Sequence, residues 1–183
     1  MRSTVATVHD VVTRLEPGDN LEAEHRSHTL GWLRRTDDVF RRVKPAEPDQ
    51  HLVSYVVPID PAGGGVLLVE HVNAGLWLPP GGHVEVDEHP YDAAVREIGE
   101  ELGVTVTPAP DPVFLTVNLA AGHTDVSLWY TVEIPRDREL TPDAGEFHGI
   151  RWWTRDEILA ADPARFDTHL TRFLEKLPQR STV

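Results

Sequence analysis

The stretch that most constrains the fold of this 183-residue chain runs from Gly82 to Val104, GHVEVDEHPYDAAVREIGEELGV. Pro90 suits the first position of a helix, where its missing N–H would be unpaired anyway. Gly103 suits the position just after the end of a helix. The sequence therefore predicts a helix from Pro90 to Leu102, with an apolar line toward the core made of Ala94, Ile98 and Leu102.

Three glutamates are expected on one side of this helix. Glu97 and Glu101 are one turn apart and Glu100 lies beside them, so the three carboxylates project from an arc of about 100°. Such pairs repel by a few tenths of a kcal/mol each unless a positive group lies among them. A divalent cation would relieve the repulsion, and oxygen ligands favour Mg²⁺ or Mn²⁺ over zinc. For the EIGEE segment alone, a solvated acidic helix face is the alternative.

The complete spacing is more specific than the glutamates. Gly82 is followed after five residues by Glu88, and after seven more by Arg96-Glu97-Ile98-Gly99-Glu100-Glu101-Leu102-Gly103-Val104. This pattern resembles the Nudix box of the Nudix hydrolase family at every specified position. Segments 77–82 (WLPPGG) and 151–153 (RWW) also look like that family, so the resemblance extends over residues 51 to 160.

The resemblance implies an α/β fold, the Nudix α/β/α sandwich with a mixed β-sheet. Short apolar runs between turn residues predict strands, at 51–59, 65–72, 76–78, 104–107, 113–119, 126–134 and 150–153. Thr154 is expected to cap a helix that ends near Ala161. Pro163 is expected to open a final helix with one apolar face, made of Phe166, Leu170, Phe173 and Leu177.

Residues 1–48 are predicted to form an N-terminal helical extension, and residues 49–183 the Nudix hydrolase domain. The first helix is expected over residues 4–15, with its apolar face at Val5, Val8, Val12 and Leu15. Asp19 is expected to cap a second helix to Arg35, with inward residues Leu21, His25 and Trp32. The extension is expected to be a purely structural helical hairpin, with packing on the core, dimerisation or covering of the active site as the alternatives.

Nudix hydrolases cleave a pyrophosphate bond in nucleoside diphosphates linked to another group, with Mg²⁺ or Mn²⁺ activating a water. By resemblance, Glu97, Glu100, Glu101 and the Gly82 carbonyl are the expected metal ligands, with Glu97 alternatively the general base. Arg96 is expected to position a glutamate of the box by ion pairing. Glu146 is expected to bind metal or activate water, the alternative being a solvated loop carboxylate.

Four side chains are candidates for substrate binding: Glu85, Trp77, His123 and Asp125. Trp77 suits stacking on a base, although a strand aromatic is more often core. His123 and Asp125 suit hydrogen bonds to a base or ribose. Markers of family members that act on ADP-ribose or diadenosine polyphosphates are absent at positions 119–122, LAAG. By elimination, the leading substrate is a nucleoside triphosphate or modified nucleotide.

Composition limits the other possibilities. The net charge is −13, and the 9 Lys or Arg against 21 Asp or Glu after residue 50 disfavour bulk nucleic acid as a partner. A small phosphorylated substrate is expected instead. The chain has no cysteine and no apolar run of membrane-spanning length. We therefore expect a cytoplasmic protein with no membrane partner, which can form a homodimer. A non-catalytic Nudix-like module that senses a nucleotide or mediates protein contacts is the alternative function.

Overall fold

The computed structural model of the chain describes residues 3–43, 47–120 and 122–178. Within them, seven strands form one sheet, in which the central order is β3-β2-β1-β6-β5 and β4 and β7 pair with β1 and β2. Strands β1 and β6 run parallel and the other pairs are antiparallel, so the sheet is mixed. The strands are β1 (Gln50–Ile59), β2 (Val66–His71), β3 (Leu76–Leu78), β4 (Gly81–His83), β5 (Phe114–Ala120), β6 (His123–Glu133) and β7 (Phe147–Trp153).

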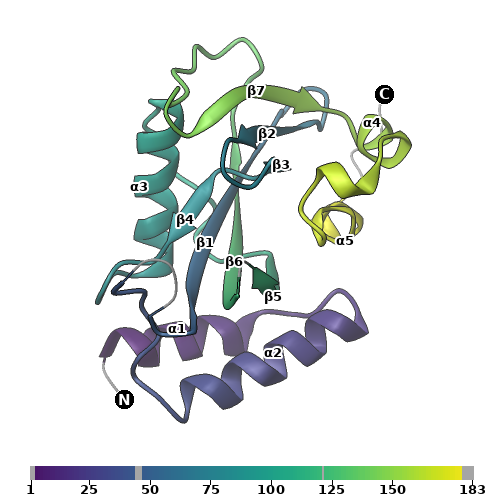
Figure 1. Cartoon of the computed structure of the whole chain (residues 1–183). Coiled ribbons are helices and arrows are strands. Elements are labelled where there is room, and N and C mark those ends of the chain that lie inside the picture. The colour runs from purple at the N-terminus through teal and green to yellow at the C-terminus, as the bar shows by residue number, and fades with distance from the viewer. Residues whose placement is uncertain (1–2, 44–46, 121, 179–183) are drawn as a thin grey trace.

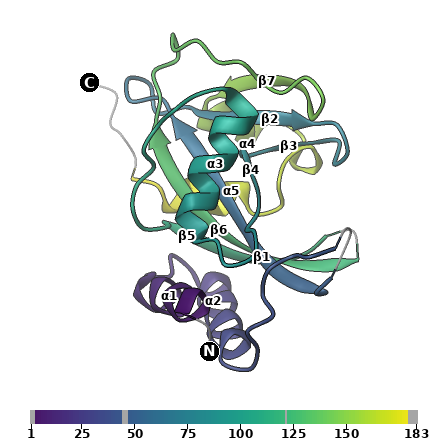
Figure 2. The ribbon, with the colours of Figure 1, turned by 90° about the vertical axis from the view of Figure 1, so that its left-hand side faces the viewer.

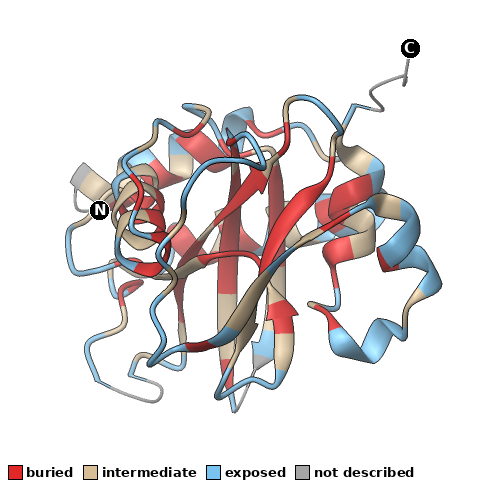
Figure 3. Ribbon diagram, turned by 90° about the horizontal axis from the view of Figure 1, so that it is seen from above, coloured by how far each residue is buried: buried red, intermediate tan, exposed pale blue. Residues whose placement is uncertain are grey.

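Helices cover both faces of this sheet (Figures 1 and 2). Helix α3 (Pro90–Leu102) lies on one face, where Ile98 and Leu102 share a buried cluster with Leu52 and Val56 of β1. On the other face lie α4 (Arg155–Ala160), a 3₁₀ turn, η1 (Pro163–Arg165), and α5 (Leu170–Lys176). Their core is a second cluster that includes Trp129 and Phe173. The predicted α/β/α sandwich is confirmed, and Figure 3 shows the buried strands in its middle.

The N-terminal helices α1 (Ser3–Arg14) and α2 (Asn20–Leu33) pack at the ends of the strands, beside β5 (Figure 1). The predicted apolar face of the first helix is confirmed, because Val5, Val8 and Val12 are fully buried and Leu15 nearly so. These side chains belong to the same buried cluster as the α3 face of the sheet. The boundary between an extension and a Nudix domain at residues 48 and 49 stays a prediction.

The inward face of α2 agrees with the prediction at Trp32, which is buried, and differs from it at Leu21. Leu21 is 40% exposed, whereas the neighbouring Glu22 is fully buried. The apolar pattern alone favoured Leu21 over a charged neighbour. In the fold, the Glu22 carboxylate is stabilised by two backbone amides, those of Gly18 and Leu115, and by Lys176. A buried charge with this many partners is acceptable in a core.

Two predicted elements are wrong. Residues 104–107 do not form a strand; Pro108 and Pro110 lack N–H groups and interrupt any ladder that would begin there. The helix expected from Pro163 is broken after η1, because Phe166 forms a bridge with Trp77 and the Asp167 amide donates to the Trp77 carbonyl. Its apolar residues still reach the core, since Phe166, Leu170 and Phe173 are buried.

Strand β4 was not predicted, because its residues read as a glycine-rich loop. Gly81 pairs with Tyr55 of β1 and has φ of +146°. A Cβ at this position would lie 2.2 Å from the Ser54 carbonyl oxygen, so only glycine allows the two backbones to approach this closely. This pairing places the start of the glutamate-rich segment against the centre of the sheet. Among the described residues, no helix is long and apolar enough to cross a membrane.

Candidate active site

Helix α3 has the predicted bounds and carries the three glutamates. Pro90 occupies its first turn, the His89 side chain accepts from the Tyr91 amide, and Gly103 ends it with φ of +66°. Ala94, Ile98 and Leu102 are fully buried, which confirms the predicted apolar line and fixes the rotation of the helix. The glutamates consequently line the side of α3 that faces the Gly81-Gly82 segment.

Glu101 is the most buried of the three, at 5% exposed. Its Oε2 accepts a hydrogen bond of 2.9 Å from the Gly81 amide. Burial raises the pKa of this carboxyl to about 9, against the Gly81 hydrogen bond, and the neighbouring carboxylates of Glu97, Glu146 and Glu100 add to the rise. A carboxylate in this position is costly unless a positive group joins it.

Glu97 lies beside it, with a side chain 14% exposed. Burial raises its pKa as well, partly opposed by the hydrogen bond and charge of Arg96. A Cβ on Gly82 would fall 2.4 Å from Glu97 Oε1. The missing side chain at residue 82 therefore makes the room that Glu97 occupies. Glu100 is more open, with 63% of its side chain exposed.

Arg96 joins the acidic residues of the segment. Its Nε and Nη2 donate to the two carboxylate oxygens of Glu88, each at 2.9 Å. Its Nη1 donates to Glu97 at 2.7 Å and to Glu100 at 3.2 Å. Nη2 also donates to the His83 carbonyl oxygen, 3.2 Å away. The hydrogen bonds that Arg96 donates to Glu88 contribute most to raising the pKa of Arg96, so the guanidinium stays charged and fixes several carboxylates at once.

The two outlying carboxylates lie on loops. Glu146 is exposed in the turn before β7, and its charge contributes to the raised pKa of both Glu97 and Glu101. Glu85 is also exposed, and its amide donates to Glu88 Oε2 at 2.9 Å. The structure thus brings Glu146 within electrostatic range of the α3 glutamates and places Glu85 on the loop that leads to α3.

The other substrate-binding candidates lie apart from the glutamates. Trp77 is only 9% exposed and packs edge-on against Trp153, with ring centroids 5.3 Å apart. His123 and Asp125 lie at the start of β6, and His123 Nε2 is 3.2 Å from Asp125 Oδ1. Of the marker positions at 119–122, residue 121 lies outside the described residues.

Three residues near the site were not among the candidates. His51 and His83 converge on Asp125. Arg41 lies close enough to Asp125 and Glu97 that both charges act on it, although burial has the larger effect and lowers its pKa. The alternation of β1 and β6 was visible in the sequence, but the parallel register that places His51 beside Asp125 was not. Knowledge of that register would have placed His51 beside Asp125 and His123, and the pairing of β4 with β1 is also needed to add His83.

Comparison with known proteins connects this arrangement to a family. The NUDIX domain model matches residues 49–177, more than half of the chain. The chain belongs to the Nudix family. A solved structure of the MutT protein from Methanosarcina mazei Go1 aligns with a TM-score of 0.60 and 21% identity, covering 68% of this chain and 90% of MutT. At that identity the alignment supports the fold alone.

Two sequence relatives are enzymes by name. Phosphatase NudJ of Escherichia coli K12 is 31% identical over 109 residues, which cover 57% of this chain and 69% of NudJ. The m7GpppN-mRNA hydrolase NUDT17 of Danio rerio is 31% identical over 101 residues. That match covers 46% of this chain and only 34% of the length of NUDT17. The matches support assignment of this Nudix chain as a pyrophosphohydrolase.

Proposed function

We propose that the chain hydrolyses a pyrophosphate bond in a small nucleotide, with a nucleoside triphosphate or modified nucleotide as the leading substrate class. The observation that carries this proposal is the grouping of three glutamates on α3. Glu97 lies against Gly82, Glu101 accepts from the Gly81 amide, and Arg96 is bonded to Glu97 and Glu100. This grouping lies inside the matched Nudix domain.

The donor set fits Mg²⁺ or Mn²⁺. Glu97 and Glu101 are both largely withdrawn from water, and their carboxyls have raised pKa values because burial and the charges of neighbouring carboxylates disfavour their ionised forms. A hard divalent cation held by carboxylate oxygens compensates both effects. Glu97, Glu100 and Glu101 would hold it, together with the Gly82 carbonyl. When bound, such an ion neutralises phosphate charge and lowers the pKa of an attacking water.

The protein residues have separable tasks in this proposal. Arg96 positions Glu97 and Glu100 and holds the loop through the His83 carbonyl. The Gly81 amide orients Glu101 through Oε2. Glu146 or Glu97 is proposed to accept the proton of the attacking water; Glu146 lies on an exposed loop, and its charge acts on both Glu97 and Glu101. The large negative charge of the chain also suits a substrate that arrives with its own metal ion rather than as a bare anion.

A nucleotide panel tests the proposal. Phosphate or pyrophosphate release is measured with Mg²⁺ and with EDTA, using coupling enzymes that are checked separately under both conditions. Glu100→Gln and Glu101→Gln should lose at least about 100-fold in kcat on the best substrate, because each removes a charged ligand. Glu24→Gln, on the exposed side of α2, is the matched control. Full metal-dependent turnover in both glutamine variants would disprove the assignment.

A further inference from the structure

A second group of potential metal ligands is separate from the glutamates and differs from them in chemistry. His51 comes from β1, His83 from β4, and His123 and Asp125 from β6. One ligand atom from each lies within 4.8 Å of the other three. Three imidazole nitrogens and one carboxylate oxygen therefore converge on a single small volume.

The sheet register explains why these residues meet. His51 is the direct partner of Asp125 in the parallel β1–β6 pair, and Val53, two residues later, is the partner of His83. Residues two apart in a strand point to the same face. His123 and Asp125 are also two apart, so all four side chains belong to one face of the sheet. This face is opposite to the one where Leu52 packs with α3.

The hydrogen bonding of His51 leaves a lone pair directed into the group. Its side chain is fully buried, and Nδ1 lies 2.8 Å from the Pro48 carbonyl oxygen. Because a carbonyl only accepts, Nδ1 must carry the proton, and in the neutral ring Nε2 is then an acceptor. Such a bond to a backbone carbonyl is the usual way in which a protein orients a metal-binding histidine.

Three of the converging atoms are buried and have no hydrogen-bond partner. His51 Nε2 and His123 Nε2 each lie 3.2 Å from Asp125 Oδ1, and His83 Nε2 lies 3.9 Å from it. His51 Nε2, His83 Nε2 and Asp125 Oδ1 are buried without a hydrogen bond. A neutral His51 that faces a carboxylate places two acceptors against each other. A cation among them would remove that repulsion and satisfy all of these atoms.

The donor set identifies the class of cation. Imidazole nitrogen suits zinc and similar transition metals, whereas Mg²⁺ takes oxygen ligands. Ligand atoms about 2.0 to 2.1 Å from a tetrahedral Zn²⁺ are roughly 3.3 Å from one another. The two separations of 3.2 Å match that spacing, and His83 needs to move inward by less than 1 Å relative to Asp125.

We propose that His51, His83, His123 and Asp125 form a Zn²⁺ site that is separate from the Nudix glutamates. Four protein ligands make it a closed site of the structural type. His83 directly follows Gly82, and its carbonyl accepts from Arg96. The ion would thus tie β4, where the Nudix box begins, to β1 and β6. This proposal does not depend on the proposed hydrolysis.

Metal binding by the full chain tests the site directly. The protein is stripped with a chelator and dialysed against Zn²⁺, and bound metal is counted by mass spectrometry. The thermal midpoint is measured with and without Zn²⁺, and Co²⁺ substitution is followed by visible absorption, which is intense for tetrahedral sites. We expect one Zn²⁺ per chain at this site, a higher thermal midpoint with Zn²⁺, and a tetrahedral Co²⁺ spectrum.

The variants separate this site from the glutamates. His123→Asn and Asp125→Asn should weaken Zn²⁺ binding at least about 10-fold, since outer partners alone cost 10- to 100-fold. His148→Gln, an exposed histidine elsewhere, should bind normally. The Glu100→Gln and Glu101→Gln double variant should also retain this Zn²⁺.

Three results would each overturn the proposal: retention of Zn²⁺ in both ligand variants, loss of Zn²⁺ only in the glutamate variant, or no stoichiometric Zn²⁺ binding by the wild-type chain. Because His123 and Asp125 are partly exposed, the test does not require replacement of the fully buried His51.

Discussion

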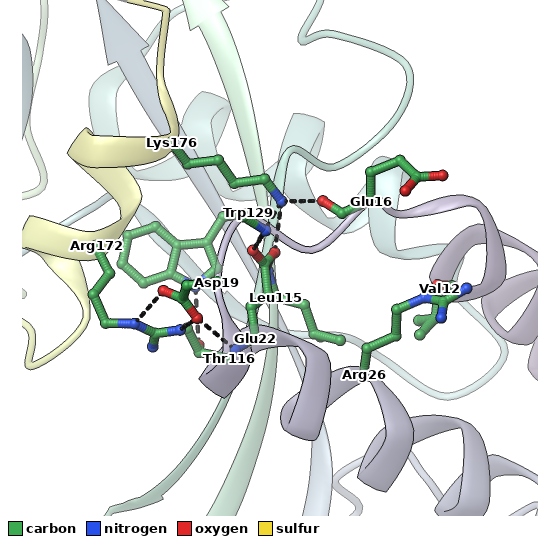
Figure 4. A network of polar contacts seen from close by, with 11 residues as sticks. Val12, Glu16, Asp19, Glu22, Arg26, Leu115, Thr116, Trp129, Arg172 and Lys176 are labelled. Atoms are coloured by element: carbon green, nitrogen blue, oxygen red, sulfur yellow. Dashed lines mark hydrogen bonds and ion pairs between the residues drawn. The ribbon is translucent and has the colours of Figure 1, made fainter.

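Lys176 Nζ lies 2.7 Å from Oε1 and 2.9 Å from Oε2 of Glu22, so one ion pair joins α5 to α2 across almost the whole length of the chain (Figure 4). Glu22 is fully buried, and its carboxylate also accepts from the Leu115 amide of β5. The N-terminal helices are thereby connected to both the sheet and the last helix. A buried pair of this kind is costly to break, because the remaining partner keeps its charge without compensation.

Glu22→Gln should therefore destabilise the protein by about 3 kcal/mol, the low end for breaking a buried ion pair. The amide retains the shape and can still accept from Leu115, but its NH₂ group then faces the Gly18 amide donor, so the loss combines this unpaired contact with the uncompensated charge of Lys176. Urea unfolding followed by tryptophan fluorescence measures it. Asp111→Asn breaks an exposed pair with Arg14, 3.0 Å long, and should cost less than about 1 kcal/mol. An equal loss in the free energy of unfolding for the two variants would show that burial does not strengthen the contribution of the Glu22 ion pair.

Features set by local contacts were predicted from the sequence, whereas features set by contacts between distant residues were not. The bounds of α3 are set by Pro90 and Gly103, which act through their own backbone geometry, and they were predicted correctly. The burial of Glu22 depends on Lys176 and Leu115, which no local pattern connects to it. A charged residue in a helix is predicted to be exposed when its distant partners are not known.

The same distinction holds for the residues of the candidate sites. The glutamates of α3 were recognised because the whole motif lies in one continuous segment. The histidine group was not recognised, because His51 meets Asp125 only through the parallel pairing of β1 with β6. His83 joins them only because β4 forms, and that strand depends on the close approach of Gly81 to Ser54. Register between distant strands is the information that the sequence alone lacks.

Asp167 gives a pH-dependent prediction. Burial raises the pKa of its carboxyl from 3.8 to about 6, against the hydrogen bond from the His169 amide. Because the folded protein holds this proton more tightly than the unfolded chain, the contribution of Asp167 to stability falls as pH rises from about 4 through 6. Asp167→Asn removes the buried charge and still offers an oxygen to His169. It should stabilise the protein by about 1 to 2 kcal/mol at pH 8 and give little gain at pH 4.

Chemical unfolding of Asp167→Asn at several pH values between 4 and 8 checks this expectation. Asp137→Asn, a change at an exposed loop position, provides the baseline for loss of one negative charge. The gain from Asp167→Asn relative to that baseline should appear between pH 4 and pH 7 and then level off. A gain that is independent of pH would mean that the carboxyl charge is not its cause.

Arg96→Lys tests the fork geometry of the arginine. Arg96 contacts Glu88 through two nitrogens and Glu97 through a third, and a lysine ammonium cannot reproduce this arrangement although it keeps the charge. We expect kcat to fall at least about 10-fold, with a higher Mg²⁺ concentration needed for half-maximal rate, because Glu97 and Glu100 lose their fixed positions. Arg138→Lys, on an exposed loop, is the control. An unchanged Mg²⁺ dependence would exclude positioning of the carboxylates as the role of Arg96.

Replacement of the adjacent Gly81 and Gly82 by alanine should have different effects: a loss of stability at Gly81 and a loss of kcat at Gly82. At Gly81 a Cβ would meet backbone atoms, 2.2 Å from the Ser54 oxygen and 2.8 Å from the Tyr55 Cα, at a φ of +146°. Gly81→Ala should therefore destabilise the fold by at least about 2 kcal/mol, since neither backbone can move easily. At Gly82 the three atoms nearest to the Cβ would all belong to the end of the Glu97 side chain, the first of them 2.4 Å away. That side chain can move, so Gly82→Ala should keep the stability of the wild type within about 1 kcal/mol and lose about 100-fold in kcat through displacement of Glu97.

Gly149→Ala, with no atom within 4 Å of the added Cβ, is the control for both. Thermal unfolding and kcat measured on the same preparations distinguish the two effects, and an active Gly82→Ala variant would show that the position of Glu97 does not limit turnover.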